Sequence, residues 1–253
     1  MRRLAPVLIV LALLGAWELA ARWDLLADAL GIEPFLIPAP SDVAKALWED
    51  RELLAEDSWV TLQEVLLGFA VAVAAGVLFA IPLHLSTPLR QALYPILVAS
   101  QTIPIIVVAP ILVVWFGFGI GPKLAIIALI CFFPITVNTL DGLRSVDPEL
   151  VKLMRTLDAS RWQLFRRVEA PTALPYFFSG AKIAVAVAVI GAVFGEWSGS
   201  DSGLGHLMLQ ASAQLLTARL FAAVAILSAF AICLFWLLGA LERRVAWWGP
   251  RGV

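Results

Sequence analysis

The sequence predicts an all-α polytopic membrane protein with about six transmembrane helices. The chain of 253 residues is 61% hydrophobic and 15% charged, with a mean hydropathy of +0.92, and this balance excludes an ordinary soluble domain. Six apolar segments are long enough to cross a bilayer. One long polar stretch, residues 147–175, interrupts them and has helical periodicity rather than loop composition.

Composition and motifs give no support to several other functional classes. The formal net charge is −1, so there is no bulk basic signal for nucleic acid. Cys131 and Cys233 lie in apolar runs with no nearby His or Asp, and they predict neither a zinc site nor a disulfide framework. The sequence has no glycine-rich phosphate loop and no Ser/His, Asp/Asp or HExxH arrangement at membrane depth. We therefore expect no catalytic residues, no metal, no cofactor and no nucleic acid.

Residues 1–21 predict an N-terminal transmembrane helix. A cleaved signal peptide is the alternative, since a basic start and an apolar core fit one too. The apolar run is longer than a usual signal-peptide core and has no clear A-x-A cleavage site, so an uncleaved span is favoured. Residues 22–60 are polar and mixed, and they predict a loop outside the bilayer with a short interfacial helix that starts at Ser41.

Five further spans are expected along the rest of the chain. Gly68 and Gly76 lie inside the first of them, where small residues allow close helix packing. A tight glycine-rich turn, residues 117–123, is expected before the fourth span of the chain. The five spans are predicted at residues 61–85, 92–116, 124–140, 172–197 and 220–241.

Polar side chains and prolines within these spans are the candidates for a solute path. Polar groups at membrane depth tend to be functional because their desolvation is costly. The alternatives are a structural kink at the proline, helix–helix hydrogen bonds for Thr102 and Asn138, snorkelling for Lys182 and an interfacial position for Glu196. The candidates are Gln101, Thr102, Pro104, Asn138, Lys182 and Glu196.

Two histidines are assigned no role in transport. His84, near the end of the second span, is interpreted as an interfacial side chain rather than a proton relay. His206, in a Gly/Ser-rich segment, is expected to be solvated.

The distribution of basic residues predicts the orientation of the chain. If the N-terminus is cytoplasmic, 12 of the 18 Lys and Arg residues lie in inside segments and 5 lie in outside segments. This bias favours cytoplasmic N- and C-termini. It also places the polar stretch in the cytoplasm.

The polar stretch predicts a helix–turn–helix elbow. Asp147 can cap a first helix with Pro148 at its first position. Apolar residues then recur at i, i+3, i+4 and i+7 from Leu150. Ser160 can cap a second short helix, Arg161 to Glu169, which is expected to end at Ala170-Pro171.

The elbow resembles the cytoplasmic coupling loop of permease subunits of ATP-binding-cassette (ABC) importers. Lys152-Leu153-Met154 matches that family's E-A-A positions, Asp158 its glycine, and Pro171 to Pro175 its hydrophobic-x-x-Pro ending. Two of these residues depart from the pattern: lysine replaces the acidic residue and aspartate replaces the glycine. Asp tolerates a left-handed turn better than most residues, so the elbow geometry is expected to be kept.

The resemblance implies a domain organisation, partners and site residues. Residues 61–248 would form a type-1 transmembrane domain with its coupling loop at 144–175. The partners would be two ABC ATPase subunits, an extracytoplasmic substrate-binding protein, a second permease copy and the lipid bilayer of the inner membrane. The residues expected to contact the ATPase are Leu150, Leu153, Met154, Arg155, Leu157, Asp158, Ser160, Arg161, Phe165, Arg166 and Pro171.

The substrate class and two alternative functions stay open at this point. The Gln101-Thr102 and Gly195-Glu196-Trp197 pairings favour the group of permeases for thiamine-precursor pyrimidines. Riboflavin, alkanesulfonate, taurine and nitrate are the alternative substrates. An ion-coupled secondary carrier is the alternative transport class, although the mid-span segments contain no carboxylate pair. A surface-bound amphipathic hairpin is the alternative for the elbow.

Overall fold

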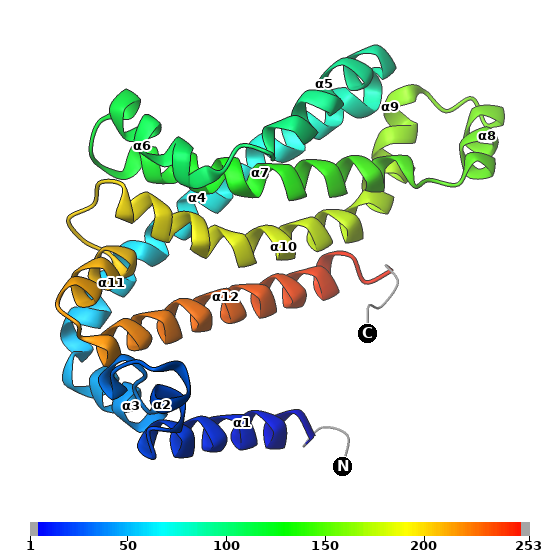
Figure 1. Cartoon of the computed structure of the whole chain (residues 1–253). Coiled ribbons are helices and arrows are strands. Elements are labelled where there is room, and N and C mark those ends of the chain that lie inside the picture. Colours follow the sequence, from blue (N-terminus) through cyan, green and yellow to red (C-terminus); the bar gives the residue numbers. More distant parts are fainter. Residues whose placement is uncertain (1–4, 249–253) are drawn as a thin grey trace. The chain divides into compact units, whose positions relative to one another are not determined.

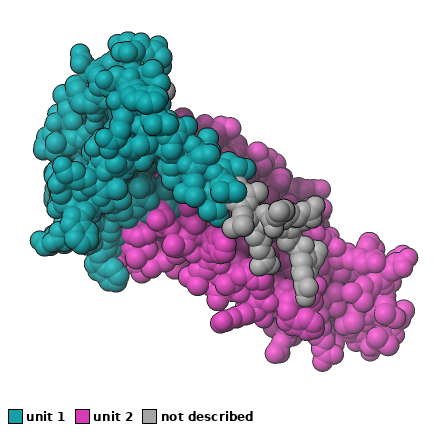
Figure 2. All heavy atoms as spheres, turned by 90° about the horizontal axis from the view of Figure 1, so that it is seen from below, with its two compact units in different colours: residues 1–61, 201–228 teal, residues 62–200, 229–253 magenta. Residues whose placement is uncertain are grey.

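Helices are the only regular secondary structure in the part of the chain that the computed structural model describes, residues 5–248 (Figure 1). The chain divides into two compact units, residues 1–61 with 201–228 and residues 62–200 with 229–253, coloured in Figure 2. Two of the three unit boundaries fall within the long helices α4 (Arg51–Leu85) and α12 (Thr217–Val245), and the third lies between Ser200 and Asp201. No strand occurs among the described residues, which confirms the predicted all-α class.

The remaining helices belong to one unit or the other. The first unit contains α1 (Ala5–Arg22), α2 (Leu25–Leu30), η1 (Pro34–Leu36), α3 (Pro40–Glu49) and α11 (Leu204–Ala213). The second contains α5 (Thr87–Ser100), α6 (Ile105–Phe116), α7 (Ile120–Arg144), α8 (Pro148–Thr156), α9 (Arg161–Leu164), the π-helical turn η2 (Phe165–Glu169) and α10 (Ala170–Trp197).

Four helices are long and apolar enough to cross a membrane: α4, α7, the continuous helix Arg161–Trp197 and α12. The pair α5 and α6 is a fifth candidate, bent by 99° at its break. The predicted third span is therefore two helices rather than one, because Pro104 cannot continue α5 and instead precedes α6. The predicted first span falls partly on residues 1–4, which lie outside the described residues.

In the second unit, α4 packs closely against α7 at two glycines. A Cβ on Gly68 of α4 would lie 2.7 Å from the Ile127 side chain, and one on Gly76 would lie 2.7 Å from Ile135. Gly68 and Gly76 are eight residues apart on α4, and the residues that they contact are eight apart in the same direction on α7. The two helices therefore run parallel and in contact. The prediction that these two glycines allow close packing is confirmed.

The contact between α7 and α10 is antiparallel and equally tight. Gly191 contacts the backbone of Ile127, and Gly180 contacts Asn138. The two glycines are eleven residues apart on α10, and their partners are eleven residues apart in the opposite direction on α7. A Cβ atom on Gly180 would lie 2.5 Å from the carbonyl oxygen of Pro134. This distance is too short for a carbon atom, so glycine is required for the close contact. In Figure 1 these two helices lie side by side over most of their length. They form the central pair of this unit.

The first unit is joined by polar contacts between segments far apart in sequence. Arg219 donates two hydrogen bonds of 2.7 Å to the Asp50 carboxylate. Asp57 and Thr61 accept hydrogen bonds from the backbone amides of Gly203 and Leu204, at 2.7 and 2.8 Å, and so cap the start of α11.

One histidine of the first unit differs from its sequence-based interpretation. His206 on α11 is half-buried, with its Nε2 atom 2.8 Å from the side-chain amide of Gln210. The expectation that His206 is merely solvated is therefore wrong.

Candidate functional site

The first helix of the elbow, α8, is capped at both ends by its own sequence. The Asp147 carboxylate accepts a hydrogen bond of 2.8 Å from the amide of Glu149, and Pro148 occupies the first turn. At the other end, the amides of Asp158 and Ala159 donate to the carbonyls of Arg155 and Met154, each at 3.0 Å. This is a Schellman ending, which places the residue after the cap in the left-handed region.

Asp158 occupies that left-handed position with φ of 56°. The predicted turn is therefore confirmed, with Asp in the place where glycine has no steric penalty.

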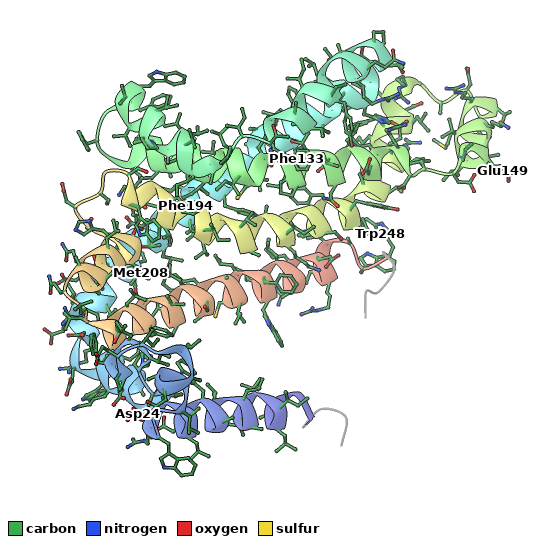
Figure 3. The ribbon with its side chains drawn as sticks, in the orientation of Figure 1. Asp24, Phe133, Glu149, Phe194, Met208 and Trp248 are labelled. Atoms are coloured by element: carbon green, nitrogen blue, oxygen red, sulfur yellow. The ribbon has the colours of Figure 1, made fainter. Side chains whose placement is uncertain are left out.

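The apolar stripe of α8 is exposed. Leu150, Leu153 and Leu157 are 40%, 53% and 69% exposed, and no residue of α8 is buried. Glu149 stands on the same isolated helix in Figure 3, at the far end of the unit from α6. A helix that exposes its apolar stripe and is capped at both ends is suited to binding another protein.

The start of the second elbow helix carries an aromatic pair beside basic residues. Ser160 and Gln163 form a reciprocal capping box, with bonds of 3.2 and 2.8 Å. The rings of Trp162 and Phe165 stack with centroids 5.6 Å apart, and Trp162 is 65% exposed. A hollow of about 390 Å³ is lined by Trp162, Gln163, Arg166 and Arg167.

The predicted end of this helix at Ala170-Pro171 is wrong. The helix passes from α9 through the π-helical turn η2 directly into α10. A proline in a regular helix clashes with the carbonyl four residues earlier and removes one hydrogen bond. The wider π-helical turn just before Pro171 relieves that conflict, and the hydroxyl of Thr172 donates to the Val168 carbonyl at 2.7 Å.

Trp248 contacts this junction from the end of the described chain. Its indole Nε1 donates to the carbonyl of Pro171 at 3.3 Å (Figure 3). That carbonyl lacks its usual helical partner, because Pro175, four residues later, has no N–H. The indole therefore satisfies a backbone acceptor that the second proline leaves free.

Arg161 binds two buried side chains, although its own side chain is 51% exposed. Its Nη1 atom donates to Oε1 of Glu169 at 2.6 Å, and its Nη2 atom lies 3.2 Å from Nε2 of His84. His84 Nε2 lies 2.8 Å from Oε2 of the same carboxylate. Its side chain is only 9% exposed, so His84 is buried against protein, and its interfacial position in the membrane stays a prediction.

The candidate path residues fall into separate places. Gln101, Thr102 and Pro104 lie together at the exposed bend between α5 and α6, where the Thr102 hydroxyl donates to the Ala99 carbonyl at 2.8 Å. Asn138 on α7 donates to the Pro134 carbonyl at 2.7 Å.

Two further candidates lie on α10. Lys182 pairs with Glu242 of α12, and Glu196 is 1% exposed. These two residues are about 21 Å apart along the helix at 1.5 Å per residue. The structure therefore does not bring the six candidates into one cluster.

A buried ion pair was missed by sequence reasoning. Lys123 Nζ lies 2.5 Å from Oε1 of Glu64 and 2.6 Å from the hydroxyl of Ser200. The side chains of Lys123 and Glu64 are 8% and 3% exposed. The turn is predicted to extend to Lys123, whereas α7 begins at Ile120 and includes this residue. The sequence did contain a signal for this pair. Glu64, Lys123 and Glu196 lie at span ends that are predicted to be on the same side of the membrane, so opposite charges could meet there.

The chain matches known proteins over most of its length. Residues 72–247 match the family model described as binding-protein-dependent transport system inner membrane component. A probable ABC transporter permease protein of Haemophilus influenzae is 40% identical over 97% of this chain and 98% of its own. The formylaminopyrimidine transport permease protein ThiX of Halalkalibacterium halodurans is 38% identical over 97% of this chain and 96% of its own.

Other relatives and a solved structure are also similar. Proteins named for riboflavin, aliphatic sulfonate and taurine transport match at 29–38% identity. The fold resembles a chain of the inward-facing MetNI methionine ABC transporter, with a TM-score of 0.69, 19% identity, and coverage of 78% of this chain and 98% of that one. The protein belongs to the family of binding-protein-dependent transport system inner membrane components and is a membrane-embedded permease subunit of an ABC importer, not an enzyme.

Proposed function

We propose that the elbow is the surface through which this permease binds a cytoplasmic ATPase subunit. The observation that carries the proposal is α8, whose apolar stripe is exposed although both of its ends are capped. Leu150, Leu153, Met154 and Leu157 would enter an apolar cleft of the ATPase, and the stacked Trp162 and Phe165 would extend that contact. Arg155 and Arg166 would face acidic or carbonyl groups around it.

The same proposal includes the orientation and the remaining partners. The excess of basic residues in one set of loops supports cytoplasmic N- and C-termini in the inner membrane. The family description refers to a binding protein, and we infer an extracytoplasmic one for this chain. A second permease copy and two ATPase subunits would complete the transporter.

Movement of the elbow would be passed on through α7 and α10. These helices lead into and out of the elbow, and their glycines hold them in close contact. A displacement of the elbow upon ATP-driven closure of the ATPases would therefore move both helices together. Alternating access would follow from this rigid-body movement.

We further propose that the solute path is lined at the bend between α5 and α6. Gln101 and Thr102 are exposed there beside Pro104, at a break in a candidate span. Irregular backbone at membrane depth is tolerated where it lines a cavity or is buried in protein. Asn138, Lys182 and Glu196 are the further candidates, each bound within the protein in the conformation described here.

Replacing Leu153 with aspartate is expected to abolish co-purification of the ATPase with the permease. The substitution places a charge in the docking stripe, but Leu153 is 53% exposed, so the permease itself should fold normally. Leu30→Asp, at an exposed leucine of α2, is the matched control and should leave co-purification unchanged. Normal binding by the Leu153 variant would contradict the docking proposal. Proton-driven uptake by the permease alone would instead indicate a secondary carrier.

We propose a thiamine-precursor pyrimidine as the solute, supported by the two residue pairings and by the 38% identity to a formylaminopyrimidine permease. Proteoliposomes holding the permease, its ATPase and its binding protein should take up radiolabelled formylaminopyrimidine when ATP is supplied. Excess unlabelled pyrimidine should compete, whereas taurine, nitrate, alkanesulfonate and riboflavin should not. Competition by one of these four solutes would reassign the substrate without affecting the permease function.

A further inference from the structure

We propose that His84, Glu169 and Arg161 are positioning residues that fasten the elbow to the end of α4. This inference rests on the proposed coupling function of the elbow and extends it to a third helix. His84 is the second-last residue of α4, Arg161 is the first residue of α9, and Glu169 is the last residue of the π-helical turn. All three belong to the second unit.

A single carboxylate holds the other two side chains. Glu169 accepts from Arg161 through Oε1 at 2.6 Å, and its Oε2 atom lies 2.8 Å from His84 Nε2. The Glu169 and His84 side chains are 6% and 9% exposed, whereas Arg161 is 51% exposed. A carboxylate is rarely buried unless it is paired, so Glu169 is stable in this place because both partners reach it.

The π-helical turn creates this arrangement. In a regular helix, residues eight apart are separated by about 80° around the axis, at about 100° per residue. One regular turn and one turn widened by a residue together hold about eight residues, so Arg161 and Glu169 come to lie on one face. π-Helical turns are rare and occur frequently at functional sites. The turn therefore directs the elbow's first arginine back toward α4.

The consequence is a third route from the elbow into the membrane-spanning helices. The elbow is linked covalently to α7 and α10, and this cluster links it to α4 without passing through either. Glu169 makes the two shorter contacts, at 2.6 Å to Arg161 and 2.8 Å to His84, whereas Arg161 and His84 lie 3.2 Å from each other, so loss of the carboxylate would weaken the link between α4 and the elbow. Docking of the ATPase, which uses the exposed stripe of α8, would be unaffected.

The test uses the full permease reconstituted with its ATPase and binding protein, with radiolabelled formylaminopyrimidine as the probe. The measured quantity is solute taken up per ATP hydrolysed. Glu169→Gln should lower this ratio at least about fivefold while the ATPase still co-purifies. The double variant His84→Leu with Glu169→Gln should lower it no further than Glu169→Gln alone, because both changes remove the same contact.

Two milder changes keep the test valid if Glu169→Gln does not fold. His84→Gln retains a side-chain donor toward Glu169 and should keep most of the ratio, whereas His84→Leu should lower it. Glu49→Gln, in the exposed Lys45–Glu49 pair of α3, is the matched control for loss of a carboxylate.

The outcomes separate this inference from the proposed function. An unchanged ratio in Glu169→Gln and His84→Leu, with the ATPase bound, would overturn the inference alone. A loss in the double variant as large as the two single losses multiplied together would also overturn it, since the two residues would then act independently. Failure of the wild-type permease to bind any ATPase would overturn the proposed function itself, and the inference with it.

Discussion

Replacing Lys123 with methionine is expected to lower the free energy of unfolding by about 3–5 kcal/mol, as removal of one partner from a buried ion pair does. Methionine keeps the length of the side chain but leaves Glu64 buried without its cation. The second carboxylate oxygen, Glu64 Oε2, already has no hydrogen-bond partner in the described part of the chain. Chemical denaturation of the detergent-solubilised protein would measure the loss.

A double-mutant cycle would show that the loss comes from the unpaired charge. Adding Glu64→Gln to the Lys123 variant removes the stranded carboxylate and should recover at least half of the lost free energy. Lys45→Met is the matched control, because Lys45 and Glu49 form an exposed pair with side chains 71% and 62% exposed. Its effect should stay below about 0.5 kcal/mol. An equal loss in both lysine variants would contradict the argument.

Gly180→Ala is the second change with a large expected effect, a loss of about 1–3 kcal/mol from overpacking. The added methyl group would lie 2.5 Å from the carbonyl oxygen of Pro134 and 2.8 Å from the Cβ atom of Asn138. The nearest atom belongs to the backbone of α7 and cannot rotate away, so α7 and α10 must separate. Thermal or chemical unfolding of the solubilised protein would detect the change.

A helical glycine without neighbours provides the comparison. Gly15 lies in α1, and no atom is within 4 Å of the position that its Cβ would occupy. Alanine is the better helix former, so Gly15→Ala should be neutral or stabilising by up to about 1 kcal/mol. Similar losses in the two variants would show that helix contact is not what requires glycine at position 180.

The local features of the elbow were predictable because each depends on residues a few positions apart. Asp147 and Ser160 cap the helices that follow them, and Asp158 adopts the left-handed conformation expected from its match to a glycine. Side-chain oxygens that bind nearby amides act within one turn, so sequence alone can predict them. The 3.6-residue period likewise predicts the stripe of α8.

The π-helical turn was not predicted, although it too involves residues that are only a few positions apart. Ala170-Pro171 normally ends a helix, and the choice between ending and widening depends on what the flanking residues gain. Here the continuing helix brings Glu169 to Arg161 and to a histidine 85 residues earlier in the chain. That gain exists only when α4 is in place.

The sequence by itself determined that this is a helical membrane protein, where most of its spans lie, and that it carries a capped elbow with an apolar stripe. These properties follow from hydropathy and from interactions within one or two helical turns. Only the tertiary structure decided which charges are paired, as in Glu64 with Lys123, His84 with Glu169 and Arg161 with Glu169. A buried charge is stable only when the folded helices bring an opposite charge close to it, and the spacing of residues in the sequence does not give the distance between two helices.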